Sequence, residues 1–188
     1  MPPVDGAAPA VGERYHAYAA CQGTADDPAD AQSYLRISQI HRQRKDFVKA
    51  REASDKAKAL QPNSVEIRYN EVNILEAEDK IDEATRTLKD ILASTAKRNY
   101  NPSERSNRVM LLERLAGLYR GNDQTELAVE TYRQLAELDP ALGPRSAAEV
   151  IETYRSAKEF SKAQQEADTA AKKYTDDRVL RVTRNSLL

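Results

Sequence analysis

Apolar residues recur at helical spacing along most of the chain, and residues 62–92 show this pattern most clearly. In the second half of this stretch, Ile81, Ala84 and Leu88 fall on one face of a helix, and charged residues fill the opposite face. The first half carries another amphipathic pattern, and a short polar turn joins the two. We therefore expect two packed helices, with the small Ala84 where a larger side chain would push them apart.

The two-helix pattern returns along the chain at a nearly constant period. A small residue of the second helix recurs at intervals of 34, 44 and 35 residues, and a large residue of the first helix recurs at the same intervals. The small residues are Ala50, Ala84, Ala128 and Ala163, and the large residues are His41, Leu75, Tyr119 and Tyr154. Because helices this short are not stable alone, we predict an all-α array in which each antiparallel helix pair packs against the next.

A 34-residue unit of two helices resembles the tetratricopeptide repeat (TPR). The third unit carries most of the family pattern, at Leu112, Leu115, Ala116, Tyr119, Ala128, Tyr132, Leu135 and Pro140. The second unit departs from it, with Arg68 at the first aromatic position and Ala96 at the proline position. The resemblance covers residues 31–188 and implies a right-handed superhelical array, an α-solenoid, of about four TPR units plus a truncated fifth.

The pattern predicts an order of segments along the chain. These are a flexible leader at 1–13, a cap-like N-terminal helix at 14–30, repeat 1 at 31–64, repeat 2 at 65–98, an insertion at 99–108, repeat 3 at 109–142, repeat 4 at 144–177, and the first helix of a truncated repeat 5 at 178–188. Asp30 is the expected N-cap of repeat 1. Gly143 is expected to end repeat 3, and Pro144 to open the next helix. Since the helical pattern continues to the last residue, we expect a fragment of a longer, bacterial-type repeat protein.

The insertion between repeats 2 and 3 contains a strong helix-start signal. Asn101 is the expected N-cap, Pro102 the first helical residue, and Glu104 the partner in a capping box. We expect one long helix from about Pro102 to Arg120, spanning about 28 Å. Its tip is either a solvated loop or a docking knob that presents Tyr100. In the second case, the basic residues that present Tyr100 would be Lys97, Arg98 and Arg105.

The overall charge of the chain is nearly balanced, with 29 basic and 30 acidic residues. This balance gives no general electrostatic reason to bind nucleic acid or an anionic membrane. No run approaches the ~18 apolar residues of a membrane span, and the N-terminus lacks the features of a signal peptide. Cys21 is the single cysteine, which excludes an intrachain disulfide and a thiolate metal cluster. We expect a soluble protein of the cytoplasm or the periplasm.

No constellation of residues in the sequence predicts catalysis. The two histidines, His16 and His41, belong to no metal-binding motif, and His41 occupies a packing position of repeat 1. The six glycines are scattered and form no phosphate-binding loop. We therefore expect a protein that is not an enzyme and that uses no metal ion or cofactor.

In the TPR family, the first helices of successive repeats line a concave groove that binds a peptide or helix of a partner. Carried onto this sequence, the resemblance implies the groove residues Leu35, Gln39, Arg42, Tyr69, Asn70, Asn73, Glu113, Arg114, Arg120, Glu152 and Arg155, with Gln32, Glu76, Gly117 and Ala148 on the same face. Asparagine and arginine suit the unpaired backbone groups and the carboxylates of an extended peptide. The resemblance thus implies a protein–protein interaction scaffold, for a partner whose identity is left open.

A different interpretation is a structural spacer, or a self-assembling repeat segment, without a dedicated ligand. Separately, the truncated C-terminal helix is expected to present an uncovered apolar face at Val179, Val182, Leu187 and Leu188, and self-association through it would be a property of the fragment rather than a function. Nucleic-acid binding is not expected, because aromatic residues do not alternate with the basic ones around 97–114. Binding of chaperone tails is not expected either, because Leu35 and Met110 stand where that TPR subtype has lysine.

Overall fold

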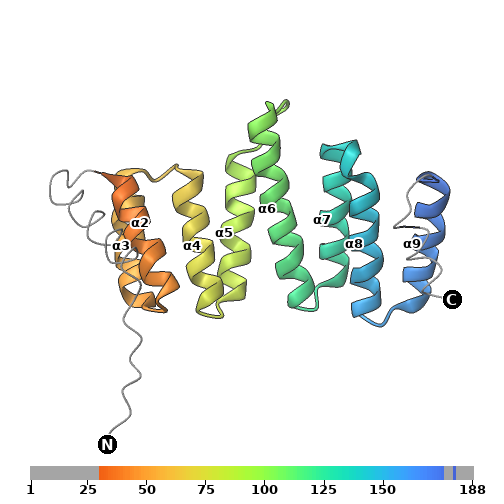
Figure 1. Cartoon of the computed structure of the whole chain (residues 1–188), viewed down its shortest axis with the longest axis horizontal. Helices are drawn as coiled ribbons and strands as arrows, with labels where there is room; N and C mark the ends of the chain where they lie inside the picture. Colours follow the sequence, from red (N-terminus) through yellow and green to blue (C-terminus); the bar gives the residue numbers. More distant parts are fainter. Residues whose placement is uncertain (1–29, 176–179, 181–188) are drawn as a thin grey trace, which may run out of the picture. The chain divides into compact units, whose positions relative to one another are not determined.

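The computed structural model describes residues 30–175 and residue 180 of the chain. Helices joined by short connections make up these residues, and no strand occurs among them (Figure 1). The elements are α2 (Ala31–Gln43), α3 (Phe47–Leu60), α4 (Val65–Ala77), α5 (Ile81–Ser94), α6 (Pro102–Gly121), α7 (Thr125–Leu138), the 3-10 turn η1 (Pro140–Leu142), α8 (Gly143–Ser156) and α9 (Phe160–Lys173). The predicted leader, nearly all of the cap-like helix and nearly all of the truncated repeat 5 lie outside the described residues.

The chain divides into two compact units, an N-terminal unit of residues 1–87 and a C-terminal unit of residues 88–188. In the N-terminal unit, α2 and α3 pack as a pair, and α4 packs against both of them. In the C-terminal unit, α6 packs on α7, α7 on α8 and α8 on α9. This sequential packing of helices confirms the predicted all-α repeat architecture.

The small residues that recur with the repeat period are fully buried. Those with an exposed fraction of 0% are Ala50, Ala84, Ala128 and Ala163. Three of the paired large residues are buried as well, namely Leu75, Tyr119 and Tyr154, while His41 is half-buried. A longer side chain at any of the four alanines would overpack the space between helices, which explains why the small residue returns at each period.

Side-chain caps begin two helices where the sequence predicted them. The carboxylate of Asp30 accepts hydrogen bonds from the amides two and three residues later, at 3.0 and 3.1 Å. At the start of α6, the Asn101 side chain accepts from the Glu104 amide at 2.9 Å, and Glu104 accepts from the Asn101 amide at 3.1 Å. This capping box confirms the predicted start of the long helix, which ends at Gly121.

The turn between the two helices of a repeat has the same backbone conformation in all four described repeats. One residue in each turn has a φ between 56° and 61°, although none of the four is glycine. These residues are Lys45, Asp79, Asp123 and Lys158. In the first turn, the amides of Lys45 and Asp46 donate to carbonyls three and five residues earlier, both at 2.9 Å. The same two hydrogen bonds recur in the other three turns, and they define a Schellman motif.

Gly143 does not end repeat 3, and this part of the sequence prediction was wrong. Its φ is −51°, and it is the first residue of α8. The space around it explains the glycine instead, because an added Cβ would lie 2.9 Å from the Cζ atom of Tyr174. Pro144 lies in the first turn of α8, as predicted.

Candidate functional site

Two of the groove residues expected in the N-terminal unit belong to its core. Leu35 is 1% exposed and Asn70 is 2% exposed. Leu35 lies in a buried cluster with Ala31, Ala57 and Ile67. Neither side chain is open to a ligand in this conformation, so the expected contact with a partner is corrected to a packing role for both residues.

Asn70 joins three helices of the N-terminal unit through buried hydrogen bonds. Its Nδ2 atom donates to Ser38 Oγ on α2 at 2.7 Å and to Ser54 Oγ on α3 at 3.4 Å. Ser38 Oγ in turn donates to the Ala50 carbonyl at 2.7 Å. The Oδ1 atom of Asn70 is buried and has no hydrogen-bond partner within the described part of the chain. Because buried amide groups are costly without partners, this network fixes how α4 packs on α2 and α3.

Four other residues expected in the groove remain partly exposed on the N-terminal unit. Gln39 and Arg42 on α2 are half-buried, as are Tyr69 and Asn73 on α4. The helices α2 and α4 contact each other. The Nε atom of Arg42 is buried, without a hydrogen-bond partner among the described residues. This pair of helices therefore carries amide, guanidinium and phenol groups on one unit.

A hollow of about 160 Å³ lies between α6, α7 and α8 of the C-terminal unit. We call it the Gly117 hollow, after the residue of α6 that lines it without a side chain. Its charged lining residues are Glu113, Arg120, Arg145 and Glu149. Glu113, Gly117 and Arg120 were expected on this face from the family resemblance. Arg145 and Glu149 on α8 were not, because their contribution depends on how closely α8 approaches α6.

The four charged groups of the Gly117 hollow are paired with one another. Arg120 Nη1 lies 3.0 Å from Glu149 Oε2, and Arg145 Nη2 lies 3.0 Å from Glu113 Oε1. Each pair joins α6 to α8, and the positive residue comes from a different helix in each case. The four residues together therefore contribute no net charge to the hollow, although both hydrogen-bond donors and acceptors line it.

The buried side of the Gly117 hollow is formed by Tyr132 and Leu135 of α7, which are 4% and 3% exposed. The guanidinium of Arg120 lies 6.0 Å from the centroid of the Tyr132 ring. Burial raises the pKa of the Tyr132 phenol. The hydroxyl therefore keeps its proton near neutral pH, and it is an uncharged polar group at the base of the hollow.

The other groove residues expected in the C-terminal unit do not line this hollow. Arg114, Glu152 and Arg155 are all exposed. On α8, Arg155 Nη1 lies 2.9 Å from Glu152 Oε2, one turn earlier in the same helix. The structure thus brings Glu113 and Arg120 together at a hollow, and it leaves the other three on open helix surface.

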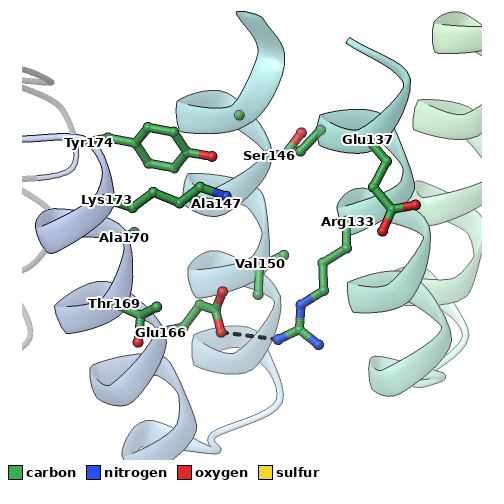
Figure 2. Close-up of a pocket in the computed structure, with 12 residues that line it drawn as sticks. Arg133, Glu137, Ser146, Ala147, Val150, Glu166, Thr169, Ala170, Lys173 and Tyr174 are labelled. Carbon is green, nitrogen blue, oxygen red and sulfur yellow. Dashed lines mark hydrogen bonds and ion pairs between the residues drawn. The ribbon is translucent and has the colours of Figure 1, made fainter. Parts of the chain in front are cut away.

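A second hollow, of about 300 Å³, lies between α7, α8 and α9 of the same unit (Figure 2). Arg133 of α7 reaches toward Glu166 of α9, and their side chains pair at 3.1 Å. The Lys173 Nζ atom lies 5.3 Å from the centroid of the Tyr174 ring at the other end. The residues between these ends are mostly small, and the repeat pattern assigns several of them to helix packing. The sequence therefore carried no separate signal for this hollow.

Tyr100, in the insertion before α6, is half-buried. Its hydroxyl accepts a hydrogen bond from the Lys97 amide at 3.0 Å, and the Arg108 guanidinium lies 5.2 Å from its ring centroid. The docking-knob interpretation named Lys97, Arg98 and Arg105 beside Tyr100, whereas the guanidinium over the ring belongs to Arg108. The ring thus holds the connection between α5 and α6 in place.

The described residues contain no group of three or more His, Cys, Asp or Glu side chains that could hold a metal ion. His41 Nδ1 lies 3.7 Å from Asp46, within the first repeat. Among the described helices, none is long and apolar enough to cross a membrane.

Comparison with known proteins identifies the repeat. The tetratricopeptide repeat family model matches residues 31–64 and 111–142. A search of the curated proteins finds no match. The solved structures that resemble this chain include PilW, described as a widely conserved type IV pilus biogenesis factor, with a TM-score of 0.63, 16% identity, and coverage of 88% of this chain and 72% of PilW.

Two further structures have comparable similarity. MamA from Desulfovibrio magneticus RS-1 aligns with a TM-score of 0.64 and 14% identity, covering 89% of each chain. YrrB, described as a TPR protein with an unusual peptide-binding site, aligns with a TM-score of 0.60 and 13% identity, covering 91% of this chain and 82% of YrrB. At these identities the likeness concerns the fold. Together with the two segments that match the family model, it shows that the chain contains tetratricopeptide repeats and has the helical-repeat fold of that family.

Proposed function

We propose that this protein is a protein–protein interaction scaffold that binds an extended peptide of its partner on the α6–α8 face of the C-terminal unit. The observation that carries the proposal is the Gly117 hollow, where two guanidinium groups and two carboxylates surround a partly apolar base. TPR proteins are in general scaffolds without enzymatic activity, and they generally bind protein partners. YrrB is described as having a peptide-binding site, which is a property of that protein.

The chemistry of the hollow suits a peptide backbone. An extended peptide leaves its own N–H donors and C=O acceptors without partners, so a binding surface must supply both kinds of group. Glu113 and Glu149 offer acceptors, and Arg120 and Arg145 offer donors, within one hollow. Charge-assisted hydrogen bonds of this kind are stronger than neutral ones.

A selection of random displayed peptides on the full chain tests the proposal. We expect the selected peptides to bind more weakly after Arg120→Ala or Arg145→Ala, because each change removes donors from the hollow. Arg133→Ala is the matched control, since it removes a cross-helix Arg–Glu pair of similar length, 3.1 Å, outside the hollow. Circular dichroism establishes that each variant is folded. Selected peptides that bind all three variants equally would refute the proposed site.

The spacer interpretation has one observation in its favour. Large apolar side chains are exposed at the beginning of two helices, with Val48 70% exposed on α3 and Phe160 62% exposed on α9. Such residues can support contacts between copies of the chain. Sedimentation at increasing concentration separates the two functions, because a spacer that self-assembles gains mass and a monomeric binder does not. Phe160→Ser should abolish any such gain.

A further inference from the structure

We propose that the Gly117 hollow is a specificity pocket, which accepts one uncharged side chain of about leucine or glutamine size from the bound peptide. This inference rests on the proposed peptide-binding function, and it adds the chemical class of the peptide residue that the pocket selects. Its starting point is a glycine in the interior of α6, a position where glycine normally weakens a helix relative to alanine.

Neither the backbone nor the packing of the protein requires glycine at position 117. No described glycine has a positive φ, so Gly117 does not supply a conformation that other residues avoid. A Cβ added at Gly117 would have no atom within 4 Å, so no neighbouring group needs the space. The glycine is therefore unlike Gly143, whose Cβ would collide with Tyr174.

The missing side chain is what makes the hollow. The corresponding positions of the other three repeats carry Gln39, Asn73 and Glu152, each with a side chain of several atoms. At Gly117, the space above Tyr132 and Leu135 is left open over about 160 Å³. This volume admits one side chain of medium size from a bound molecule.

The charges around the hollow indicate that the entering side chain is neutral. Arg120 and Arg145 already pair with Glu149 and Glu113 at 3.0 Å. A charged side chain that enters the hollow loses its hydration. It must then either break one of these ion pairs or lie beside a group of its own charge. A neutral side chain can lie on the Tyr132 ring without either cost, while the peptide backbone bonds to the paired groups at the rim.

The occupant is therefore an extended peptide whose anchor residue is uncharged. Leucine or methionine would place apolar atoms against Tyr132 and Leu135, and glutamine would add hydrogen bonds to the rim. An aspartate, glutamate, lysine or arginine at the anchor position is disfavoured, because the charged groups around the hollow are already paired with one another.

Filling the hollow from inside the protein tests this proposal. Gly117→Gln restores the kind of side chain that other repeats carry at this position, and Gly121→Gln is the matched control on the same helix. A Cβ at Gly121 also has no atom within 4 Å, and Gly121 does not line the hollow. Peptides are selected from a random displayed library on the full wild-type chain and then measured on both variants.

We expect Gly117→Gln to weaken the selected peptides by about tenfold or more, since a filled pocket loses the contacts of one side chain. Gly121→Gln should leave their affinity unchanged. Within the peptides, replacing the shared neutral residue with aspartate or lysine should weaken binding to the wild-type protein to a similar extent. Circular dichroism of both variants should show full helicity.

The possible failures have separate meanings. Peptides that bind wild type and Gly117→Gln equally would overturn the pocket, although binding that still depends on Arg120 and Arg145 would uphold the proposed function. A charged residue shared by all selected peptides would overturn the neutral anchor. A library that yields no binding peptide on the wild-type chain would overturn both the pocket and the proposed function.

Discussion

The side chain of Tyr174 lies so close to Gly143 that a Cβ on Gly143 would be 2.9 Å from the Tyr174 Cζ atom. Gly143→Ala must therefore displace the phenol ring from the start of α8. Because the ring is the far end of a side chain that can rotate, we expect a cost of about 1 kcal/mol, at the low end for overpacking. Urea unfolding measures the change in the free energy of unfolding.

A double-mutant cycle shows whether the ring is the cause. In a Tyr174→Ala background the collision is gone, and the higher helix propensity of alanine should make Gly143→Ala stabilising by up to about 1 kcal/mol. The sign of the effect thus reverses between the two backgrounds. An equal loss of stability in both would mean that the glycine serves the backbone of α8 instead.

The second prediction concerns Asn70, whose side chain bonds to Ser38 and Ser54. Asn70→Ala should destabilise the protein by about 2 kcal/mol, because it leaves buried hydroxyl groups with fewer partners. Peptide binding at α6–α8, measured at a temperature where the variant remains folded, should be unchanged. A variant of full stability would contradict the buried network.

A companion substitution gives this network a pH signature. Asn70→Asp places a carboxyl group in the same buried position, where burial favours its neutral form and raises its pKa in the folded state. The loss of stability that comes from burying the ionised carboxylate is then absent at low pH, and it grows as the pH rises above the unfolded-state pKa. We expect Asn70→Asp to be less stable than Asn70→Ala at pH 7, and to approach it in acid. Urea unfolding across this pH range measures both.

The third prediction concerns Glu78, at the end of α4. Hydrogen bonding to Lys80, at 2.8 Å, and to Arg51 on α3 holds the pKa of the Glu78 carboxyl below its ordinary value. A lowered pKa means that the ionised carboxylate stabilises the folded state when the pH is above the ordinary pKa. This stabilisation is lost as the pH falls through the lowered pKa.

Glu78→Gln should accordingly lower stability by roughly 1 kcal/mol at pH 7, and by much less at pH 3. Chemical unfolding at the two pH values gives the comparison. Glu83→Gln, on an exposed part of α5, is the control and should change little at either pH. If the stability difference between the wild type and Glu78→Gln stays constant with pH, the carboxylate charge is not what stabilises the protein.

The fourth prediction concerns the cap of α6. Asn101→Ala removes the acceptor for the Glu104 amide, and we expect a loss of about 1 kcal/mol. Asn101→Asp should retain most of the stability, because a carboxylate can accept the same hydrogen bond and also favours a helix N-terminus. Thermal unfolding followed by circular dichroism ranks the three proteins. Equal melting temperatures would mean that the long helix does not need its cap.

The repeat period could be predicted from the sequence because it rests on the spacing of small and large residues. Ala50, Ala84, Ala128 and Ala163 marked the helix pairs, and all four are fully buried. The start of α6 was also predictable, since a capping box involves residues three positions apart and needs no tertiary contact.

The turns between paired helices were harder to predict. A Schellman motif usually has glycine at its left-handed position, and this chain has lysine or aspartate there in every described repeat. The local sequence therefore lacks the usual signal. The conformation is instead maintained by the two backbone hydrogen bonds and by the packing of the helices on either side.

The candidate site could be predicted in part. Family positions led to Glu113, Gly117 and Arg120, which line one hollow. The same reasoning placed Asn70 on the surface, because the sequence does not indicate that this polar residue bonds to buried serine side chains. The contributions of α8 were missed for a related reason: pairs such as Arg145 and Glu113 depend on the approach of helices distant in sequence.

The four turns that share a left-handed residue have one more consequence. The backbones of the four turns match while their side chains differ, so no single side chain determines the turn. The three-residue segments that form the turns can therefore replace one another. The segment around Asp123 could replace the segment around Lys158 without changing the register of the helices that follow. The chain can therefore be recombined at these points, or given a new loop there, while the surface formed by α6 and α8 stays intact.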